Sequence, residues 1–388
     1  MPKPARSRIA VVKCSSYEAE SVKEALHKSV GLLGGTSQFF GAGASVLIKP
    51  NILSPDPPEK AITTHPSLVK AVAELVSSAG GTPSIGDSPG FYSFKRAAAT
   101  SGIAKAVKEA GANLSPFEEG IEIATAENCL LKKIVVAKTV AGSDAIISIP
   151  KFKTHTLTYI TAAVKNLLGC IPGLKKAEMH FRFPDNERFS RLLVDICLSI
   201  PVKLHILDAV IGMDGDGPNA GNPFAMGLIM AGTDPVALDS TACRIVGIDP
   251  MTIPMLRIGE ECGLGHASEE GIEIVGESID DVRVDGFKAV LPGADVGRLL
   301  PLPEAVLRCI RKWVVKRPRI VRETCTRCGA CVEVCPAKPK ALTMEKGVVT
   351  IDDGACILCY CCAEMCPSKA IVLKRGFAAG IVARLLKL

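Results

Sequence analysis

No stretch of this sequence is long and apolar enough to cross a membrane, since none approaches the roughly 18 apolar residues that a spanning helix needs. The N-terminus is basic, but its apolar run from Ile9 to Val12 is too short for the hydrophobic region of a secretory signal. Without either feature, the sequence predicts a cytoplasmic protein with no transmembrane segment.

An excess of one charge is also missing. The 46 Lys and Arg residues and the 40 Asp and Glu residues leave a net charge of +6 over 388 residues, which by itself does not indicate a nucleic-acid-binding protein. Hydrophobic residues make up 48% and charged residues 22% of the chain, as in a globular protein with a sizeable core. The length allows two or three domains.

Three signatures of familiar enzymes and nucleotide-binding proteins are absent. The segment GDSPG at 86–90 has the spacing of a serine nucleophile elbow. The residue after Ser88 is Pro89, however, which has no N–H group to contribute to an oxyanion hole. The glycines at 41–43 precede a predicted strand instead of following one, so they do not form a dinucleotide fingerprint, and no Walker loop is present.

Cysteine, in contrast, is abundant, with 16 residues in a chain that lacks a secretory signal. Thiols stay reduced in the cytoplasm, so clustered cysteines indicate metal binding and not disulfides. Nine of the cysteines lie between Cys325 and Cys366. The other seven lie in apolar or helical contexts and are interpreted as small core residues. They are Cys14, Cys129, Cys170, Cys197, Cys243, Cys262 and Cys309.

The clustered cysteines form two identical runs, C-x2-C-x2-C-x3-C, each followed by proline. In this arrangement three cysteines of a run bind one [4Fe–4S] cluster and the fourth binds the other cluster. The spacing therefore predicts two clusters with an exchanged ligand. The first would use Cys325, Cys328, Cys331 and Cys366, and the second would use Cys356, Cys359, Cys362 and Cys335.

Zinc is the alternative metal, because zinc sites also use paired C-x2-C motifs. Zinc would leave unexplained why two four-cysteine runs are identical and why both end in proline, at Pro336 and Pro367. Cys361 lies outside the register of the second run and could compete with Cys362. Because the register is complete without it, we interpret Cys361 as an extra thiol beside the second cluster.

The first part of the chain alternates short β-branched runs with helical stretches. The segments 8–14, 45–51 and 145–151 are predicted strands, and a helix is predicted to begin at Pro66 and to end at Gly80. Alternating strands and helices with nearly continuous apolar strands predict an α/β fold, with a mostly parallel sheet and helices on both faces. A small C-terminal α+β ferredoxin-like domain is expected to follow.

Composition divides the chain into four parts. We expect an α/β domain at 1–300, a basic linker helix at 301–322, the ferredoxin-like domain at 323–375 and a short amphipathic tail at 376–388. The linker holds seven basic residues against one acid. Between the two cysteine runs, a turn at Gly347 predicts a small hairpin that covers the clusters.

Several segments together resemble the family known as domain of unknown function 362. The resemblance covers roughly residues 8–280 and implies the α/β fold, with the C-terminal ferredoxin domain that this family often carries. Its motifs are KPN (49–51), THP (64–66), GDSPG (86–90), the long run at 150–173, MH (179–180), LDAVIGMDGDGPNAG (207–221) and AGTDPVALDSTACRIVGIDP (231–250).

Basic and amide side chains follow several predicted strands, and the carboxyl ends of parallel strands meet at one sheet edge. We therefore expect a cationic pocket for a small anionic ligand, such as a carboxylate or a phosphate. A basic surface in contact with water is the alternative. The predicted ligand-binding residues are Lys49, Asn51, Lys151, Lys165, Asn166, His180 and Asp214, and the predicted catalytic residues are Lys153, His155 and Asp87.

Two of these candidates, Asp87 and Asp214, are carboxylates that follow strands. Such carboxylates could bind a divalent cation in the α/β domain or act as acid and base, but they commonly cap turns as well. The turn after Asp214 is not an EF-hand, because Pro218 occupies the third ligand position and no Glu closes the loop.

The sequence leaves three functions open. An iron–sulfur oxidoreductase or its electron-transfer subunit would relay electrons between a redox partner protein and the anionic ligand. A non-catalytic electron carrier or cofactor-maturation factor would use the α/β domain to bind a partner protein. An iron–sulfur regulator would place the basic segment 308–322 on nucleic acid, but a helix packed on the body explains that segment at least as well, so no nucleic acid is expected.

Overall fold

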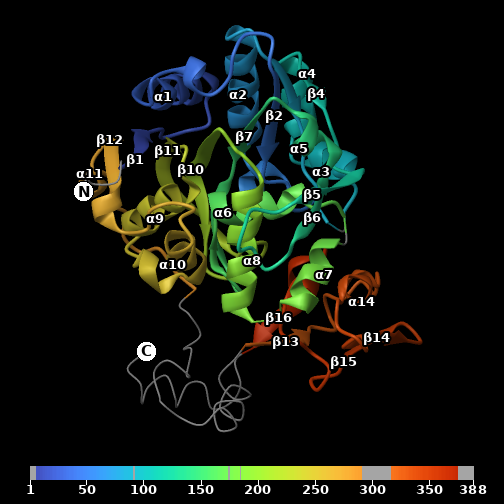
Figure 1. The fold of residues 1–388 in the computed structure, drawn as a ribbon. Coiled ribbons are helices and arrows are strands. Elements are labelled where there is room, and N and C mark those ends of the chain that lie inside the picture. The colour runs from blue at the N-terminus through green and yellow to red at the C-terminus, as the bar shows by residue number, and fades with distance from the viewer. Residues whose placement is uncertain (1–5, 91, 174, 184, 291–315, 375–388) are drawn as a thin grey trace.

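The computed structural model describes residues 6–90, 92–173, 175–183, 185–290 and 316–374 (Figure 1). The predicted tail at 376–388 and most of the predicted linker at 301–322 lie outside these residues. The described end of the linker corrects one expectation, since Arg317–Ile320 form a strand and not a helix. Within the described residues, no helix is long and apolar enough to cross a membrane.

A sheet of ten strands forms the centre of the large domain (Figure 1). Its order is β12-β1-β11-β10-β7-β2-β3-β4, with β8 and β9 branching from β10. Most neighbouring strands are parallel, and β11 and β9 pair antiparallel with their neighbours, which confirms the predicted mostly parallel sheet. The bounds are β1 Ser7–Lys13, β2 Ser45–Pro50, β3 Thr82–Ile85, β4 Asn113–Leu114, β7 Ala145–Ile149, β8 Lys151–His155, β9 Tyr159–Thr161, β10 Leu204–Asp214, β11 Asn222–Gly232 and β12 Ile272–Gly276.

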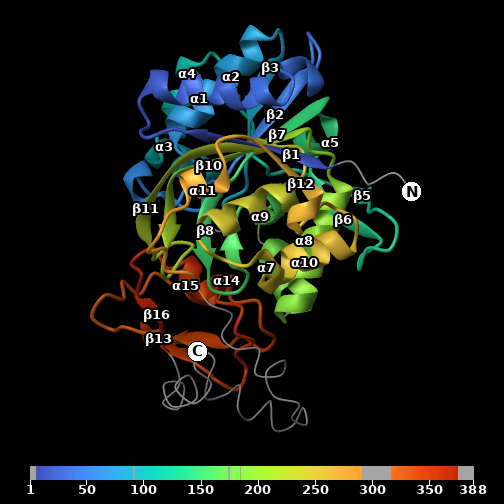
Figure 2. The same cartoon turned by 90° about the vertical axis from the view of Figure 1, so that its left-hand side faces the viewer.

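Helices cover both faces of this sheet (Figure 2). Successive strand residues point to opposite faces, so Ile9 and Val11 pack into one core and Ala10 and Val12 into the other. The second core packs against α1 Ala19–Leu32, α2 Pro66–Ser78, α3 Phe94–Thr100 and α4 Ile103–Glu109. The first core packs against α6 Ala163–Asn166, α8 Asn186–Ser199, α9 Pro235–Ile245 and α10 Pro254–Glu261.

The large domain also contains a two-stranded hairpin and three short helices outside the two main helical layers. The strands β5 and β6 form a hairpin, and α7 lies between the large domain and the C-terminal domain (Figure 1). The bounds are β5 Gly120–Ala124, β6 Lys133–Ala137, α5 Lys138–Gly142, α7 Lys175–Arg182 and α11 Ile279–Val282.

Local sequence signals set the ends of the helices. The helix α2 begins with Pro66 at its first position, and the side chain of His65 before it accepts a hydrogen bond from Ser67 N. After Ala79 the chain turns at Gly80, whose φ of 81° is left-handed. The predicted start and end of this helix are thereby confirmed.

The C-terminal domain is small and repeats itself internally. A hairpin of β14 Leu342–Glu345 and β15 Val348–Ile351 turns at Gly347, as predicted, and β13 Arg317–Ile320 pairs with β16 Ile371–Lys374. The short helices α14 Ala330–Val334 and α15 Cys361–Glu364 follow left-handed residues at equivalent places, Gly329 and Tyr360. The repeated sequence thus folds into a repeated backbone conformation.

Candidate cluster sites and the cavity between the domains

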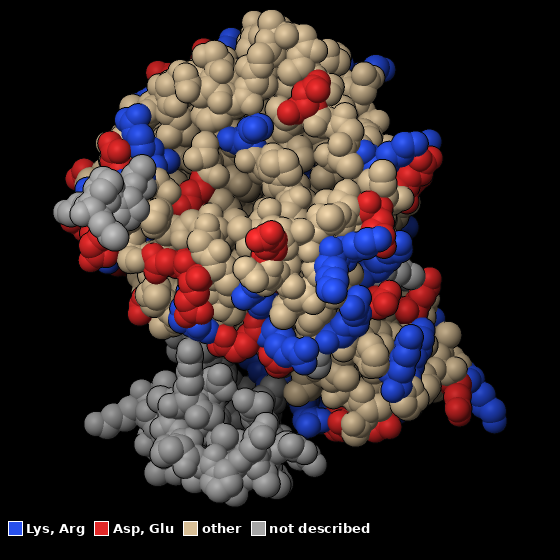
Figure 3. Space-filling view, in the orientation of Figure 1, with Lys and Arg blue, Asp and Glu red and all other residues tan. Residues whose placement is uncertain are grey.

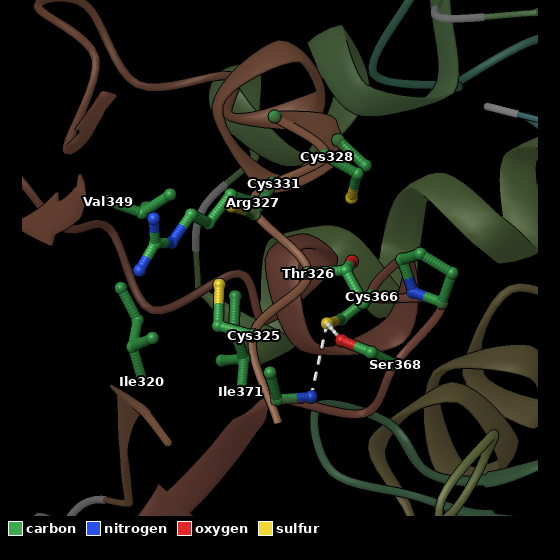
Figure 4. A pocket seen from close by; sticks show the side chains of 14 residues that line it. Ile320, Cys325, Thr326, Arg327, Cys328, Cys331, Val349, Cys366, Ser368 and Ile371 are labelled. Atoms are coloured by element: carbon green, nitrogen blue, oxygen red, sulfur yellow. Dashed lines mark hydrogen bonds between the residues drawn. The ribbon is translucent and has the colours of Figure 1, made fainter. Parts of the chain in front are cut away.

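The first cysteine set surrounds a cavity in the C-terminal domain (Figure 4). The residues Cys325, Cys328 and Cys331 come from the first run, and Cys366 comes from the second. The sulfur of Cys366 accepts a hydrogen bond of 3.2 Å from Ala370 N, the kind of contact that helps to set a cluster's potential. This is the ligand set that the spacing predicts for the first cluster.

The second set gathers beside the first and is more deeply buried. Cys335, Cys359 and Cys362 are buried, and Cys356 is half-buried. Burial raises the pKa of the Cys362 thiol well above its usual value, and the neighbouring sulfurs of Cys359, Cys356, Cys331 and Cys335 add to this effect. Thiols crowded in this way ionise when a bound cation compensates their charge, so the donor set fits an iron cluster.

The other described cysteines do not join these sets. All fifteen described cysteines are free thiols, and Cys309 lies outside the described residues. Cys14, Cys170, Cys197 and Cys243 pack in the two cores of the large domain, as expected for small apolar residues. Cys361 is buried beside the second set, where its thiol hydrogen-bonds to Cys359 and lowers the pKa of that residue.

A cavity of about 110 Å³ lies between the two domains, and we call it the interdomain cavity. Apolar and polar side chains both line it. The large domain contributes Lys49, Asn51, Asp87, Lys165, Asn166, Lys176 and His180, and the C-terminal domain contributes Val334, Cys361, Glu364 and Met365. Six of the predicted site residues therefore meet at one place.

Two hydrogen bonds fix α15 against the large domain at this cavity. The hydroxyl of Tyr92 donates to the backbone oxygen of Met365 at 2.8 Å, and Asn219 Nδ2 donates to the backbone oxygen of Glu364 at 2.8 Å. The helix α15, which carries Cys362 of the second set, is thus one wall of the cavity.

Two predicted ligand-binding residues do not reach the interdomain cavity, which corrects the expectation for them. The ammonium group of Lys151 lies 2.9 Å from Asp208 Oδ2 and donates to the hydroxyl of Tyr17. The carboxylate of Asp214 accepts a hydrogen bond from Lys288 N instead. Residues two apart in a strand lie roughly 7 Å apart, so alternation along β8 does not bring Lys151 and Lys153 to the same partner.

Lys49 and Asp87 line the cavity, but they form an ion pair with each other. Lys49 Nζ lies 2.9 Å from Asp87 Oδ1 and donates to the backbone oxygen of Pro50 and to Asn166 Oδ1, so its three N–H groups are used. A Cβ atom at Gly169 would lie 2.4 Å from Asp87 Oδ1 and 2.6 Å from Lys49 Nζ, so only glycine fits against this pair. The pair therefore acts as part of the wall.

Lys153, predicted to be catalytic, is also held by the fold. Its ammonium group donates to Asn51 Oδ1 and to the backbone oxygen of Ile62, both at 2.7 Å. Burial lowers its pKa well below the usual value, and the nearby cations Lys165 and Lys151 act in the same direction. Through these bonds Lys153 positions Asn51 in the cavity wall.

His155 and Glu364 meet across the domain boundary. His155 Nε2 lies 3.1 Å from Glu364 Oε1, while Nδ1 accepts hydrogen bonds from the backbone N–H groups of Leu157 and Thr158. Burial lowers the pKa of His155 to about 4, so the ring is neutral at pH 7. Burial opposes ionisation of Glu364, but His155, Lys165 and His180 together lower its pKa to about 2.

Three groups of the large domain remain open to a ligand in the interdomain cavity. Among the described residues, Lys165 has no hydrogen-bond or ion-pair partner, and burial lowers its pKa. Lys176 donates to the backbone oxygen of Ser88, and burial lowers its pKa to about 7. The ring of His180 stacks on Phe189, and its buried Nδ1 has no partner within the described residues.

The sequence alone did not indicate Lys176, Glu364 or the place of Cys361 in the cavity wall. Glu364 and Cys361 lie among the cluster cysteines, where the spacing draws attention to thiols alone. The sequence also did not indicate the role of Asp239. Its carboxylate accepts hydrogen bonds from Ala163 N and Val164 N and so fixes the start of α6, which carries Lys165. A single sequence gives no signal for contacts between residues so far apart in the chain.

The divalent cation expected in the α/β domain has no support. No group of three or more His, Cys, Asp or Glu side chains in the described parts of the chain is placed to hold a single metal ion. Asp87 is paired with Lys49, and Asp214 lies away from the interdomain cavity. An iron–sulfur cluster differs from such a site, because each thiolate binds a different iron.

The surface of the face shown in Figure 3 carries both charges. Lys and Arg side chains gather where α7 approaches the C-terminal domain, with Asp and Glu side chains between them (Figure 3). At this seam the ammonium group of Lys338 lies 5.9 Å from the centre of the Phe181 ring. The basic segment considered for nucleic acid, 308–322, lies mostly outside the described residues.

Comparisons with known proteins found two matching family models and a similar protein. The model of the family described as Domain of unknown function (DUF362) matches residues 46–244, and that of the 4Fe-4S dicluster domain matches residues 317–367. A thylakoid-associated protein of Synechocystis sp. is 35% identical over 263 residues, which cover 68% of this chain and 81% of that protein.

Two solved structures are similar to part of this chain. The lactate racemase apoprotein from Thermoanaerobacterium thermosaccharolyticum is 13% identical, with a TM-score of 0.38 over 63% of this chain and 58% of its own. A protein from Thermotoga maritima is 11% identical, with a TM-score of 0.37 over 64% of this chain and 60% of its own. The matched part is less than two thirds of either structure.

Proposed function

This chain belongs to the family described as Domain of unknown function (DUF362) and carries a 4Fe-4S dicluster domain, and from this premise we propose a redox function for it. Two [4Fe–4S] clusters relay electrons to or from a small anionic ligand in the interdomain cavity. The family resemblance seen in the sequence is confirmed. The relative's description as thylakoid-associated leaves the cytoplasmic location a prediction.

The observation that carries this proposal is the shared wall between the second cluster site and the interdomain cavity. Cys361 hydrogen-bonds to Cys359, a predicted ligand of the second cluster, and also lines the cavity. Glu364 and Met365 of the same segment line it too, two residues from Cys362 and one from Cys366. A ligand in the cavity would therefore lie within a few atoms of the cluster ligands.

The free groups of the cavity support an anion as the ligand. Lys165 has no partner among the described residues, and Lys176 has only a neutral backbone oxygen. A carboxylate close to Lys165 would restore the favourable interaction that burial removes. The apolar side chains of Ile52, Leu168 and Met365 would contact the rest of the ligand.

The exposure of the cysteines supports an order of electron transfer. Cys328 of the first set is exposed, whereas Cys335, Cys359 and Cys362 of the second set are buried. Cys328 would hold the first cluster near the surface, where a redox partner protein could approach it, and the buried cysteines of the second set would hold the second cluster beside the cavity. Each cluster supplies one electron when bound, so together they match a two-electron change of the ligand.

The chain's own residues would bind the ligand and move protons. Lys165 would hold the anionic end. Lys176 could give a proton from Nζ at neutral pH, because its pKa is about 7. His155 would hold the carboxylate of Glu364 in place, while Lys153 and the Lys49–Asp87 pair would keep the cavity wall rigid.

Reoxidation of the reduced clusters tests this proposal. Anaerobic protein, reduced and freed of excess reductant, is mixed with a panel of small carboxylates, and the visible absorbance of the clusters is followed. At least one carboxylate should restore the oxidised spectrum in the native protein and at least tenfold more slowly in Lys165→Ala. Lys175→Ala, which alters an exposed lysine on α7, should behave like the native protein.

The alternative is a non-catalytic electron carrier or a cofactor-maturation factor whose α/β domain binds a partner protein. The exposed Cys328 favours a carrier, because a cluster near the surface exchanges electrons readily with another protein. Reoxidation by a carrier protein but by no carboxylate, with equal rates in Lys165→Ala, would establish that alternative.

A further inference from the structure

We propose that Lys176 forms an imine with the carbonyl carbon of a 2-oxo carboxylate in the interdomain cavity. This inference rests on the proposed function, because it names the class of anion that the same cavity takes. It adds a covalent step that electron relay alone does not require.

The position of the amine supports attack on a bound ligand. Lys176 lines the cavity from α7, and its Nζ donates to the backbone oxygen of Ser88. Among the described residues it forms no ion pair with a carboxylate. A lysine held by a neutral acceptor keeps a lone pair available once it loses its proton, whereas an ion-paired lysine stays protonated.

The surroundings disfavour the charged form of this amine. Burial has the largest effect, and the cations Lys49 and Lys165 act in the same direction. Asp87 opposes them, but its charge is compensated by direct contact with Lys49. The pKa of Lys176 is thereby lowered to about 7, so the neutral amine is more accessible here than in a lysine on the surface.

The second open group supplies the carboxylate end of the ligand. Lys165 has no partner in the described parts of the chain and borders the same cavity as Lys176. A 2-oxo acid carries its carboxylate directly beside its carbonyl carbon, and both lysines line the one cavity, so we expect the carboxylate at Lys165 and the carbonyl carbon at Lys176. The apolar residues Leu53, Leu168 and Met365 leave room for a short hydrocarbon side chain.

The step is balanced and needs no oxidant or reductant. The Nζ of Lys176 attacks the carbonyl carbon and forms a C–N bond. The carbonyl C–O bond then breaks, and its oxygen leaves as water with the two protons that the amine carried. The product is an imine, which joins carbon and nitrogen by a double bond.

Trapping with borohydride tests this directly. The full-length protein is incubated with pyruvate and sodium borohydride, digested, and sequenced by tandem mass spectrometry. The native protein should carry the reduced pyruvate adduct on Lys176, and Lys176→Arg, which keeps the charge, should lose at least nine tenths of it. Exposed Lys175 is the matched control, and Lys175→Arg should keep the adduct on Lys176.

Three outcomes would overturn the inference. They are no adduct, an adduct confined to exposed lysines, or equal labelling of the cavity peptide in Lys176→Arg with native iron content. Lys165→Ala should also reduce labelling at low pyruvate and recover it at high pyruvate. Cluster reoxidation by carboxylates without any adduct would refute the imine and keep the redox function. An adduct without reoxidation would refute the redox function and keep the imine.

Discussion

His155 Nε2, at the end of β8 in the α/β domain, lies 3.1 Å from Glu364 Oε1 of α15, so these two side chains meet across the boundary between the domains. The backbone N–H groups of Leu157 and Thr158 point at His155 Nδ1, which leaves the ring hydrogen on Nε2, facing the carboxylate. The cavity between the domains thus depends on contacts from both of them.

Exchanged ligation is the first prediction. Anaerobic protein should contain about eight iron and eight sulfide per chain, and Cys335→Ser should damage the second cluster although its sequence neighbours bind the first. Iron analysis with Mössbauer spectroscopy of Cys335→Ser and Cys366→Ser measures this. Cys361→Ser is the control and should keep both clusters. Two zinc ions without sulfide would contradict the cluster assignment.

The buried pair of Lys49 and Asp87 predicts a stability effect. Their side chains are 0% and 3% exposed, so removing one partner leaves an uncompensated buried charge. Lys49→Ala and Asp87→Ala should each lower the free energy of unfolding by about 3–5 kcal/mol. Urea titration measures this. The double variant should lose less free energy of unfolding than the two single variants lose together. A normally stable Lys49→Ala that binds no ligand would show that Lys49 is a binding residue instead.

A histidine far from the clusters predicts a pH dependence. Burial lowers the pKa of His205 in β10 from 6.5 to about 3, so the folded chain keeps this ring neutral where the unfolded chain protonates it. Stability from this group is complete above pH 6.5 and falls by up to about 1.4 kcal/mol per pH unit as the pH drops towards 3.

Urea unfolding between pH 7 and pH 5 measures this effect. His205→Leu should reduce the loss of stability on acidification, because a leucine takes up no proton. His27→Leu, at an exposed position on α1, should keep the native slope. Equal slopes in native protein and His205→Leu would show that another group controls the acid response.

The packing predicts that the α/β domain folds by itself. The two large cores of the domain use residues up to Val282 together with Val284 and Phe287, and none from the C-terminal domain. A separate small cluster joins Leu53, Tyr92 and Ala177 to Met365 and its neighbours. A fragment of residues 1–300 should therefore unfold cooperatively without iron, as calorimetry would show, and a molten fragment would mean that the domains share one core.

The cluster sites follow from the sequence because their chemistry is local. Three thiolates of each run lie within a few residues of one another, and the second run repeats the first after 31 residues, 325 to 356. The predicted exchange of Cys335 and Cys366 follows from that repeat. The parallel sheet was equally predictable, because apolar strands such as 145–151 alternate with helices.

The partners of the polar residues depended on tertiary structure. Lys49 and Asp87 both follow predicted strands, and nothing in the sequence indicates that they neutralise each other across neighbouring strands. Lys176 and Glu364 face one cavity although they are far apart in the chain. The sequence by itself determined which metal clusters the protein binds and how its sheet is built. Only the tertiary structure decided which lysines lack an ion-pair partner, because pairing between residues so far apart in the chain depends on how the fold packs them together.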